Sequence, residues 1–302
     1  MYKFYFAIRQ SKEERNMGRQ RFIMFNNTIF FEYLENNDTD GAMKYAEENV
    51  PDYLYKFYSL TDGEDELNQR KFDTLKENSN WFDLACKQND PLDMKMAYID
   101  ETNTEAGKES INLAKEMMKR LIDSSAICSF IDSNEENLQM WAHYANNHHG
   151  FCIKYKVDNK KAFFRVMYEN DRIPVLSIPL NLCNEMTKST KENSETEALK
   201  MYRYLVLLLL NIKHSSWSNE QEYRLIFSVD NHFGINLSNE FIGIKPVGVY
   251  LGLKCSDTNK NTLKSIAEND LNCECYEAFI SNSKILDFRS FDNAKTDLTS
   301  KN

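Results

Sequence analysis

The fold is decided at Lys213-His-Ser-Ser-Trp217-Ser-Asn-Glu220-Gln-Glu222-Tyr-Arg224-Leu-Ile-Phe227, a stretch that follows a strongly apolar segment and has the pattern of an entry into a buried strand. Because successive side chains of an extended chain point to opposite faces, Glu220, Glu222 and Arg224 are expected to share one face. Two interpretations are open. The three side chains form a solvated row of ion pairs, which are common and weak on protein surfaces. Alternatively, Arg224 orients a carboxylate inside a cleft, where the carboxylate stabilises a developing cation or binds a ribose hydroxyl.

The composition is that of a folded chain with a sizeable core, since 42% of the 302 residues are hydrophobic. The formal net charge of −9 excludes a general attraction to nucleic acid or to an anionic membrane. The longest aliphatic run, Leu205–Leu210, is far shorter than the ~20 residues that a membrane span needs. The seven cysteines include no Cys-x-x-Cys pair, which indicates reduced thiols. With no secretory signal pattern, we expect a cytoplasmic protein that has no membrane contact.

The chain divides by composition into three parts. Residues 1–51 form an N-terminal extension, residues 52–288 form the main domain, and residues 289–302 form a flexible tail. The segment 184–195 is rich in Ser, Thr, Lys and Glu and is predicted to be a mobile insertion.

Helical and strand patterns alternate irregularly along the chain. The patterns predict helices at 39–50, 64–78, 102–123, 135–146, 196–213 and 258–269, and strands at 1–9, 54–58, 81–85, 126–131, 150–157, 163–168, 247–251 and 274–280 besides the quoted stretch. No regular repetition of strand and helix is visible, as a parallel α/β fold would require. We therefore predict an α+β fold, with a mixed or antiparallel sheet core and peripheral helices.

Six motifs occur in an order that resembles the uncharacterised bacterial family DUF2971. They are Leu54-Tyr-Lys-Phe, Asn89-Asp-Pro-Leu-Asp93, Cys128-Ser-Phe, Met140-Trp-Ala-His-Tyr144, Gly150-Phe-Cys-Ile-Lys-Tyr155 and Lys213…Trp217-x-x-Glu220-x-Glu222-x-Arg224. This resemblance covers roughly residues 52–288 and implies no activity by itself.

The Glu220-Gln-Glu222 strand is also similar to the Glu-x-Glu strand of ADP-ribosyltransferases. That similarity implies an ADP-ribosyltransferase-like fold and NAD as the substrate. It assigns Lys56, next to Tyr55, to binding the dinucleotide, and Tyr144 or Trp141 to stacking on nicotinamide. The implied function is that of an ADP-ribosyltransferase or NAD glycohydrolase, acting as an effector in toxin or phage-defence systems.

The chemistry that this similarity implies has a simple electrostatic basis. Cleavage of the bond between ribose and nicotinamide passes through an oxocarbenium-like state, as glycoside cleavage does. A carboxylate at Glu222 stabilises that charge, and Glu220 orients or deprotonates the acceptor, which is water, a protein or a nucleic acid. Arg224 keeps Glu222 ionised, because a nearby cation favours the carboxylate form.

Other polar clusters leave alternatives open. Asn89 and Asp90 either line the pocket or cap the turn around a proline. His143 and Trp217 are candidates for ligand contact, although packing also explains a tryptophan at such a position. His143, His148, His149 and Cys152 do not have the spacing of a metal site, and no metal is predicted. Two further hypotheses are a non-catalytic module that binds a ligand or a protein, and a metal-dependent hydrolase or nuclease that uses Asp90, Asp93 and His143.

Overall fold

The computed structural model describes residues 27–63, 65–90, 92–102, 107–192, 194–230 and 232–291. The predicted strand at residues 1–9 and residues 292–302 of the predicted tail lie outside these ranges. Of the predicted tail, Arg289 and Ser290 belong to a strand, and Phe291 is buried.

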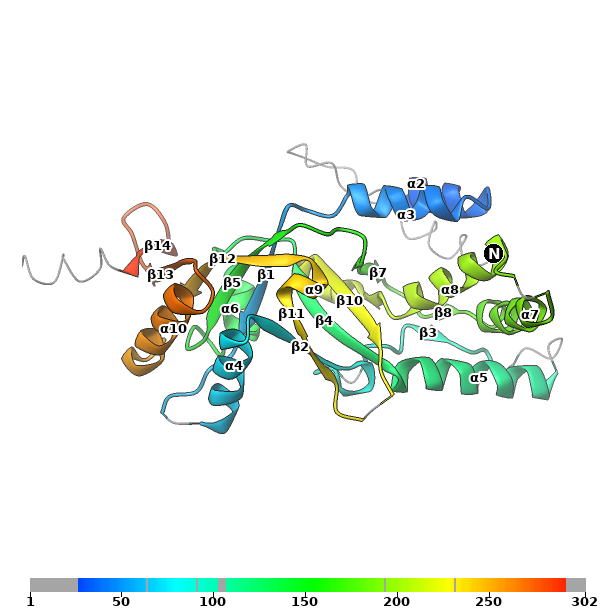
Figure 1. Cartoon of the computed structure of the whole chain (residues 1–302), viewed down its shortest axis with the longest axis horizontal. Coiled ribbons are helices and arrows are strands. Elements are labelled where there is room, and N and C mark those ends of the chain that lie inside the picture. Colours follow the sequence, from blue (N-terminus) through cyan, green and yellow to red (C-terminus); the bar gives the residue numbers. More distant parts are fainter. Residues whose placement is uncertain are drawn as a thin grey trace, which may run out of the picture.

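Helices surround a sheet core in the described ranges, which confirms the predicted α+β class (Figure 1). The α-helices are α2 (Asn27–Glu35), α3 (Thr39–Glu48), α4 (Glu66–Lys76), α5 (Lys108–Asp123), α6 (Leu138–His143), α7 (Ser177–Glu192), α8 (Glu197–Leu209), α9 (Asn239–Ile242) and α10 (Asp257–Asn269), with short 3-10 helices η1 (Ala85–Lys87) and η2 (Ser215–Glu220). No helix of the described part is long and apolar enough to cross a membrane.

The main sheet is mostly antiparallel and has the strand order β11-β2-β4-β1-β5-β12-β13-β14, with β10 pairing to β4 and to β6. These strands are β1 (Tyr53–Tyr58), β2 (Ser79–Leu84), β4 (Ser125–Ile131), β5 (Phe151–Val157), β6 (Phe163–Arg165), β10 (Glu222–Ser228), β11 (Ile235–Ser238), β12 (Ile244–Leu251), β13 (Glu274–Phe279) and β14 (Asp287–Ser290). Only the β12–β13 pair of this sheet is parallel within the described residues. Two small parallel pairs join β3 (Ala97–Tyr98) to β8 (Ile173–Pro174), and β7 (Met167–Glu169) to β9 (Ile212–His214).

The sheet forks along β4. β10 pairs with β4 over its whole length, from Glu222 opposite Ile131 to Ser228 opposite Ser125. On the other side, β2 pairs with β4 near Ile127, whereas β1 pairs with β4 at Ile131. The stretch of β4 from residue 128 to 130 therefore faces a gap between two diverging strands.

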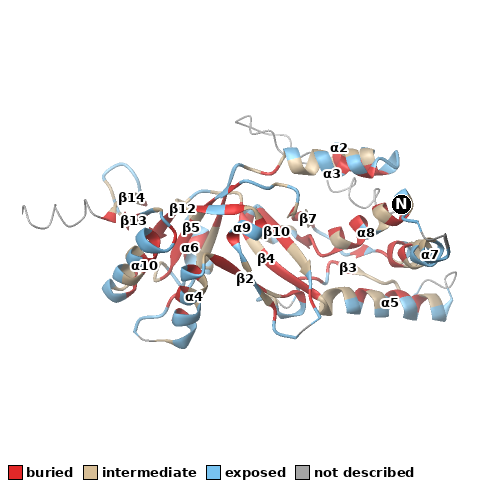
Figure 2. Ribbon diagram, viewed as in Figure 1, coloured by how far each residue is buried: buried red, intermediate tan, exposed pale blue. Residues whose placement is uncertain are grey.

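Each face of the central strands has its own core, because neighbouring side chains of a strand point in opposite directions. On β5, Phe151 and Ile153 belong to the larger core, which α4 and α10 cover. Cys152, between them, belongs to a smaller core under α6. Figure 2 shows the buried strands between exposed helix surfaces. Cys128 and Cys152 are both buried.

A second assembly of helices, with its own core, lies at the end of the molecule away from α10 (Figure 1). It contains α2 and α3, which fall in the predicted extension, together with α7 and α8. The rings of Phe30 on α2 and Tyr204 on α8 lie 6.1 Å apart, and Lys200 forms an ion pair with Asp40. The first described helices thus pack on helices of the predicted main domain.

Two segments have a secondary structure that the sequence patterns did not predict. Residues 184–192, predicted to be part of a mobile insertion, continue helix α7, because Ile178 and Leu182 of that helix are buried in the second core. The helix predicted at 196–213 ends at Leu209, and Lys213 lies instead on strand β9, opposite Tyr168 of β7. The second change places the Lys213 side chain where it meets two carboxylates.

Candidate functional site

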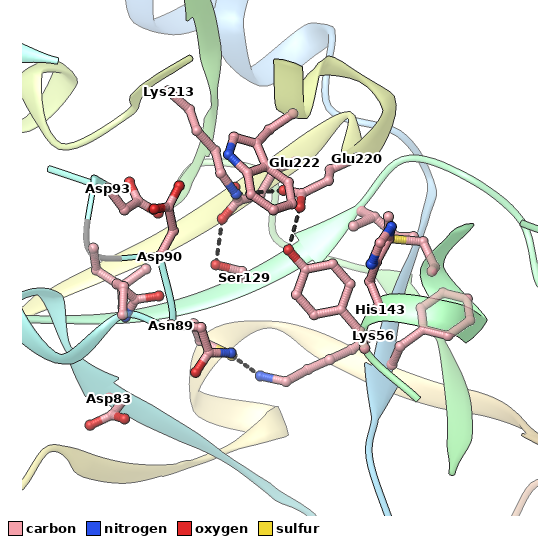
Figure 3. A pocket seen from close by; sticks show the side chains of 18 of the residues that line it. Lys56, Asp83, Asn89, Asp90, Asp93, Ser129, His143, Lys213, Glu220 and Glu222 are labelled. Atoms are coloured by element: carbon pink, nitrogen blue, oxygen red, sulfur yellow. Dashed lines mark hydrogen bonds and ion pairs between the residues drawn. The ribbon is translucent and has the colours of Figure 1, made fainter. Parts of the chain in front are cut away.

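A cavity of about 580 Å³ opens over the fork between β1 and β2 (Figure 3). Its size is within the ordinary range for small-molecule sites. Strands β1, β2 and β4, the segment after η1, helix α6 and the η2–β10 junction all contribute side chains to it. The lining residues are Tyr55, Lys56, Phe57, Trp81, Asp83, Lys87, Gln88, Asn89, Asp90, Asp93, Ile127, Cys128, Ser129, Ile131, Met140, His143, Tyr144, Lys213, Trp217, Glu220 and Glu222.

A tight turn places the two glutamates in the cavity. Glu220 is the last residue of η2, Gln221 has a left-handed backbone (φ 48°, ψ 50°), and Glu222 begins β10. Glu220 is therefore not on the strand, contrary to the prediction that Glu220, Glu222 and Arg224 share one strand face. The turn nevertheless directs both carboxylates to one ammonium group: Lys213 Nζ lies 2.5 Å from Glu220 Oε2 and 3.1 Å from Glu222 Oε2.

Hydrogen bonds and neighbouring positive charges stabilise the ionised form of Glu222. Its Oε1 accepts hydrogen bonds from Ser129 Oγ (2.5 Å) and Arg224 Nε (2.7 Å), and its Oε2 accepts from Lys213 and from the Arg224 guanidinium. Burial alone would raise the pKa of Glu222, but the charges of Arg224 and Lys213 outweigh it and lower that pKa to about 2. The interpretation of a solvated surface row is wrong, because only 3% of Glu222 is exposed.

Arg224 lies behind the cavity rather than in it. The residue is fully buried, and its guanidinium donates two hydrogen bonds to Asp93, from Nη2 to Oδ2 at 2.7 Å and from Nη1 to Oδ1 at 3.2 Å. Nη1 also donates to the carbonyl oxygen of Leu210 at 2.7 Å. Arg224 thus orients Glu222, as predicted, but it does not line the cavity and cannot contact a ligand there.

The pKa of Glu220 is shifted in the opposite direction from that of Glu222. Burial raises the pKa of Glu220, and this effect exceeds the opposing influence of Lys213 and of a hydrogen bond from Tyr144 Oη. The Lys213 pKa is raised: burial would lower it, but the neighbouring Glu222 and Glu220 charges prevail. Two carboxylates that share one ammonium group therefore have pKa values shifted in opposite directions.

Most of the predicted site residues meet at this cavity. Nine line it: Tyr55, Lys56, Asn89, Asp90, His143, Tyr144, Trp217, Glu220 and Glu222. Figure 3 shows Lys56, Asn89 and Asp90 around the same space as the two glutamates, although they come from distant parts of the sequence. The indole of Trp217 lies against the Lys213 ammonium, with 5.1 Å from Nζ to the ring centroid.

Trp141, which was predicted to contact a ligand, does not line the cavity. Met140, His143 and Tyr144 have the spacing of one face of a helical turn, and that face lines the cavity. Trp141 is fully buried on another side, where its Nε1 donates to the carbonyl oxygen of Glu135 at 2.6 Å and its ring packs on Phe57. It is a core residue.

Sequence reasoning missed Ser129 and Lys213 as site residues. Ser129 stands in a quoted motif, but nothing local indicates that its hydroxyl would meet a glutamate 93 positions later. Lys213 carried a usable signal, because a lysine placed between an apolar run and two acids is expected to be buried with a counter-charge. The prediction that Lys213 ends a helix did not suggest this role.

The charge of the cavity favours some ligands over others. Five carboxylates and three lysines line it, so acidic groups predominate. No group of three or more His, Cys, Asp or Glu side chains among the described residues is arranged to hold a metal ion. The arrangement suits a ligand with a positive charge and hydroxyl groups.

Comparison with known proteins gives one family match. Residues 140–225 match the family model described as "Protein of unknown function (DUF2971)". Neither the curated proteins nor the solved structures gave a match. The matched segment contains residues 140–143 of α6, Lys213 and the Glu-x-Glu turn, all of which contribute side chains to the cavity. Over residues 140–225, this match supports the resemblance to DUF2971 that the motifs indicated.

Proposed function

We propose that this protein binds NAD in the cavity and cleaves the bond between ribose and nicotinamide, so that ADP-ribose is released to water or transferred to a protein or nucleic-acid acceptor. The observation that carries the proposal is the pair of glutamates on the cavity floor, joined by Lys213, with pKa values shifted in opposite directions. Neighbouring carboxylates with separated pKa values are typical of sites that need a fixed charge and a proton carrier.

The substrate fits the charges of the cavity. The nicotinamide ring of NAD is cationic, and the ribose becomes cationic as the bond breaks. An excess of carboxylates favours both states. Lys56 and Lys87 line the cavity and would bind the phosphates, and Tyr55 and Trp217, which also line it, would supply aromatic contacts.

The two glutamates take different roles in this proposal. Both oxygens of Glu222 already accept hydrogen bonds, so Glu222 acts through its negative charge rather than as a nucleophile. Glu220 exchanges a proton with water or with an acceptor hydroxyl, a role that the upward shift of its pKa favours. Tyr144 and Lys213 hold Glu220 in position. Such an activity would suit an effector of a toxin or phage-defence system.

Nicotinamide release from NAD by the purified protein tests the proposal. We expect turnover by the wild type and a loss of about 100-fold or more in kcat for Glu220→Gln. A loss of similar size is expected for Glu222→Gln, provided that its thermal unfolding shows a folded protein. The control is Glu116→Gln, on the exposed surface of α5. A wild type without turnover, with or without candidate acceptors, would contradict the proposal.

One observation favours a second candidate, a module that binds a ligand without chemistry. The hydrogen-bonding capacity of Glu222 is already used by protein groups, as in a structural ion-pair network. Calorimetric titration distinguishes the two candidates. Binding of NAD with no release of nicotinamide would favour the module.

A further inference from the structure

Lys56 and Cys128 meet across the fork of the sheet. Lys56 lies on β1 and Cys128 on β4, at the place where these strands diverge. The Lys56 Nζ atom is 2.6 Å from the Cys128 Sγ atom, and both residues line the cavity. Figure 3 shows the Lys56 side chain extending into that space.

This separation is short for a hydrogen bond to sulfur. Hydrogen bonds from N–H to oxygen already have donor–acceptor distances of about 2.7–3.2 Å, and sulfur is a larger atom than oxygen. A nitrogen and a sulfur atom come this close when a single oxygen atom is covalently bonded to both. The protein therefore holds the two groups at the separation of such a bridge without any movement of the strands.

Among the residues that the structure describes, no carboxylate forms an ion pair with Lys56. Its Nζ lies instead beside the rings of Tyr58 and Phe130, at 5.6 and 5.3 Å from their centroids. The cavity gives a small oxidant access to the pair, while the buried thiol is shielded from larger reagents.

We propose that Lys56 and Cys128 form a reversible oxidative cross-link, Lys56 Nζ–O–Sγ Cys128, with molecular oxygen as the oxidant. The ammonium, the thiol and one O₂ give the N–O–S bridge, one water and one proton. One N–H bond and the S–H bond are replaced by the N–O and O–S bonds, and the second oxygen atom leaves as water. Nitrogen and sulfur each lose two electrons, which together reduce O₂.

The cross-link would change the cavity in two ways. It removes the positive charge of Lys56, and it ties β1 to β4 at the fork. Under the proposed function, this would weaken the binding of the NAD phosphates. The cross-link itself does not depend on that function, since it requires only the two side chains and the oxidant.

Intact-mass measurement of the full chain, kept in air-saturated buffer, tests the cross-link. We expect a gain of about 14 Da, from one oxygen gained and two hydrogens lost, that dithiothreitol reverses. This reversal distinguishes the bridge from methylation. Tryptic digestion should fail to cleave after Lys56 and should yield one peptide joined to the segment containing Cys128. Lys56→Arg and Cys128→Ala should each abolish the gain, whereas Cys86→Ala, which removes an exposed thiol, should retain it.

Two outcomes would overturn the proposal. One is oxidation of Cys128 to a sulfinic or sulfonic acid while trypsin still cleaves after Lys56. The other is that oxygen or added peroxide oxidises the exposed Cys86 but leaves Lys56 and Cys128 without a cross-link.

Discussion

Two groups of ion pairs in this protein have similar contact distances and very different surroundings. Arg224 contacts Asp93 at 2.7 Å with 1% of its side chain exposed, whereas Arg120 on α5 contacts Glu116 at 2.6 Å with 77% exposed. Figure 2 shows the same contrast between the buried strands and the outer surface of α5. Water screens the surface pair, but the buried pair would leave an uncompensated charge if one partner were lost.

The buried group also has an unbalanced charge. It contains three acids, Asp93, Glu220 and Glu222, and two bases, Lys213 and Arg224, so its net charge is −1 when all five are ionised. Arg224 forms ion pairs with both Asp93 and Glu222, whereas the side-chain partners of Glu220 among the described residues are Lys213 and the Tyr144 hydroxyl. The raised pKa of Glu220 relieves this excess by favouring protonation. A surface cluster has no such need, because solvent ions compensate it.

Replacing Arg224 should have the largest effect on stability. Arg224→Met leaves Asp93 and Glu222 buried with too few partners, and we expect a loss of about 3–5 kcal/mol in the free energy of unfolding. Urea denaturation at neutral pH measures it. A loss below about 1 kcal/mol would mean that the buried ion pairs contribute no more to stability than exposed ion pairs do.

Glu222→Gln should be the next most destabilising change, by about 1–3 kcal/mol at neutral pH, because charged donors lose their acceptor. The effect should depend on pH. The pKa of Glu222 is lowered in the folded state, so its stabilisation is present above its ordinary pKa of 4.5 and is lost as the pH falls toward about 2. The difference in unfolding free energy between wild type and variant should therefore shrink over that interval.

Glu220→Gln provides the matched comparison, with the opposite sign. A carboxyl whose pKa is raised by folding favours the folded state at low pH, and this contribution is lost as the pH rises through the folded pKa. The wild type should therefore lose stability relative to Glu220→Gln as the pH increases above 4.5. If the unfolding free energies of Glu220→Gln and Glu222→Gln, each relative to wild type, changed with pH in the same direction, the opposite pKa shifts of the two carboxyl groups would be contradicted.

Tyr144→Phe should cost about 1 kcal/mol, the usual contribution of one hydrogen bond. It should also raise the pKa of Glu220 further, since the Tyr144 hydroxyl favours the carboxylate form. The readout is the pH dependence of stability, in which the inflection assigned to Glu220 should move to higher pH. A shift to lower pH would mean that Tyr144 does not donate to this carboxylate.

Arg120→Met should have the smallest effect, below about 0.5 kcal/mol. The residue is exposed on α5, and its partner Glu116 remains solvated when the pair is broken. High salt should reduce the difference to zero, because screening weakens surface pairs. Together with Arg224→Met, this variant tests whether burial, rather than contact distance, sets the contribution of an ion pair.

Much of the architecture could be predicted from local pattern. The alternation at residues 150–157 predicted β5, and the polar and apolar periodicity at 258–269 predicted α10 within a residue of its start. The polar composition at 184–195 did not indicate that residues 184–192 are helical, because the buried apolar residues of this helix, Ile178 and Leu182, come before that segment. The end of α8 was misplaced because the apolar run continues past Leu209 into β9.

The sequence alone was sufficient for the α+β class, for the family resemblance and for most of the residues at the cavity, because these depend on periodicity and on motifs that are local. Tertiary structure alone decided that Glu220 and Glu222 share the ammonium of Lys213, that Arg224 lies behind the cavity, and that Trp141 belongs to the core. The reason is physical. Side-chain protonation and exposure depend on desolvation and on charges brought from distant positions, such as Asp93 to Arg224, and no local pattern contains that information.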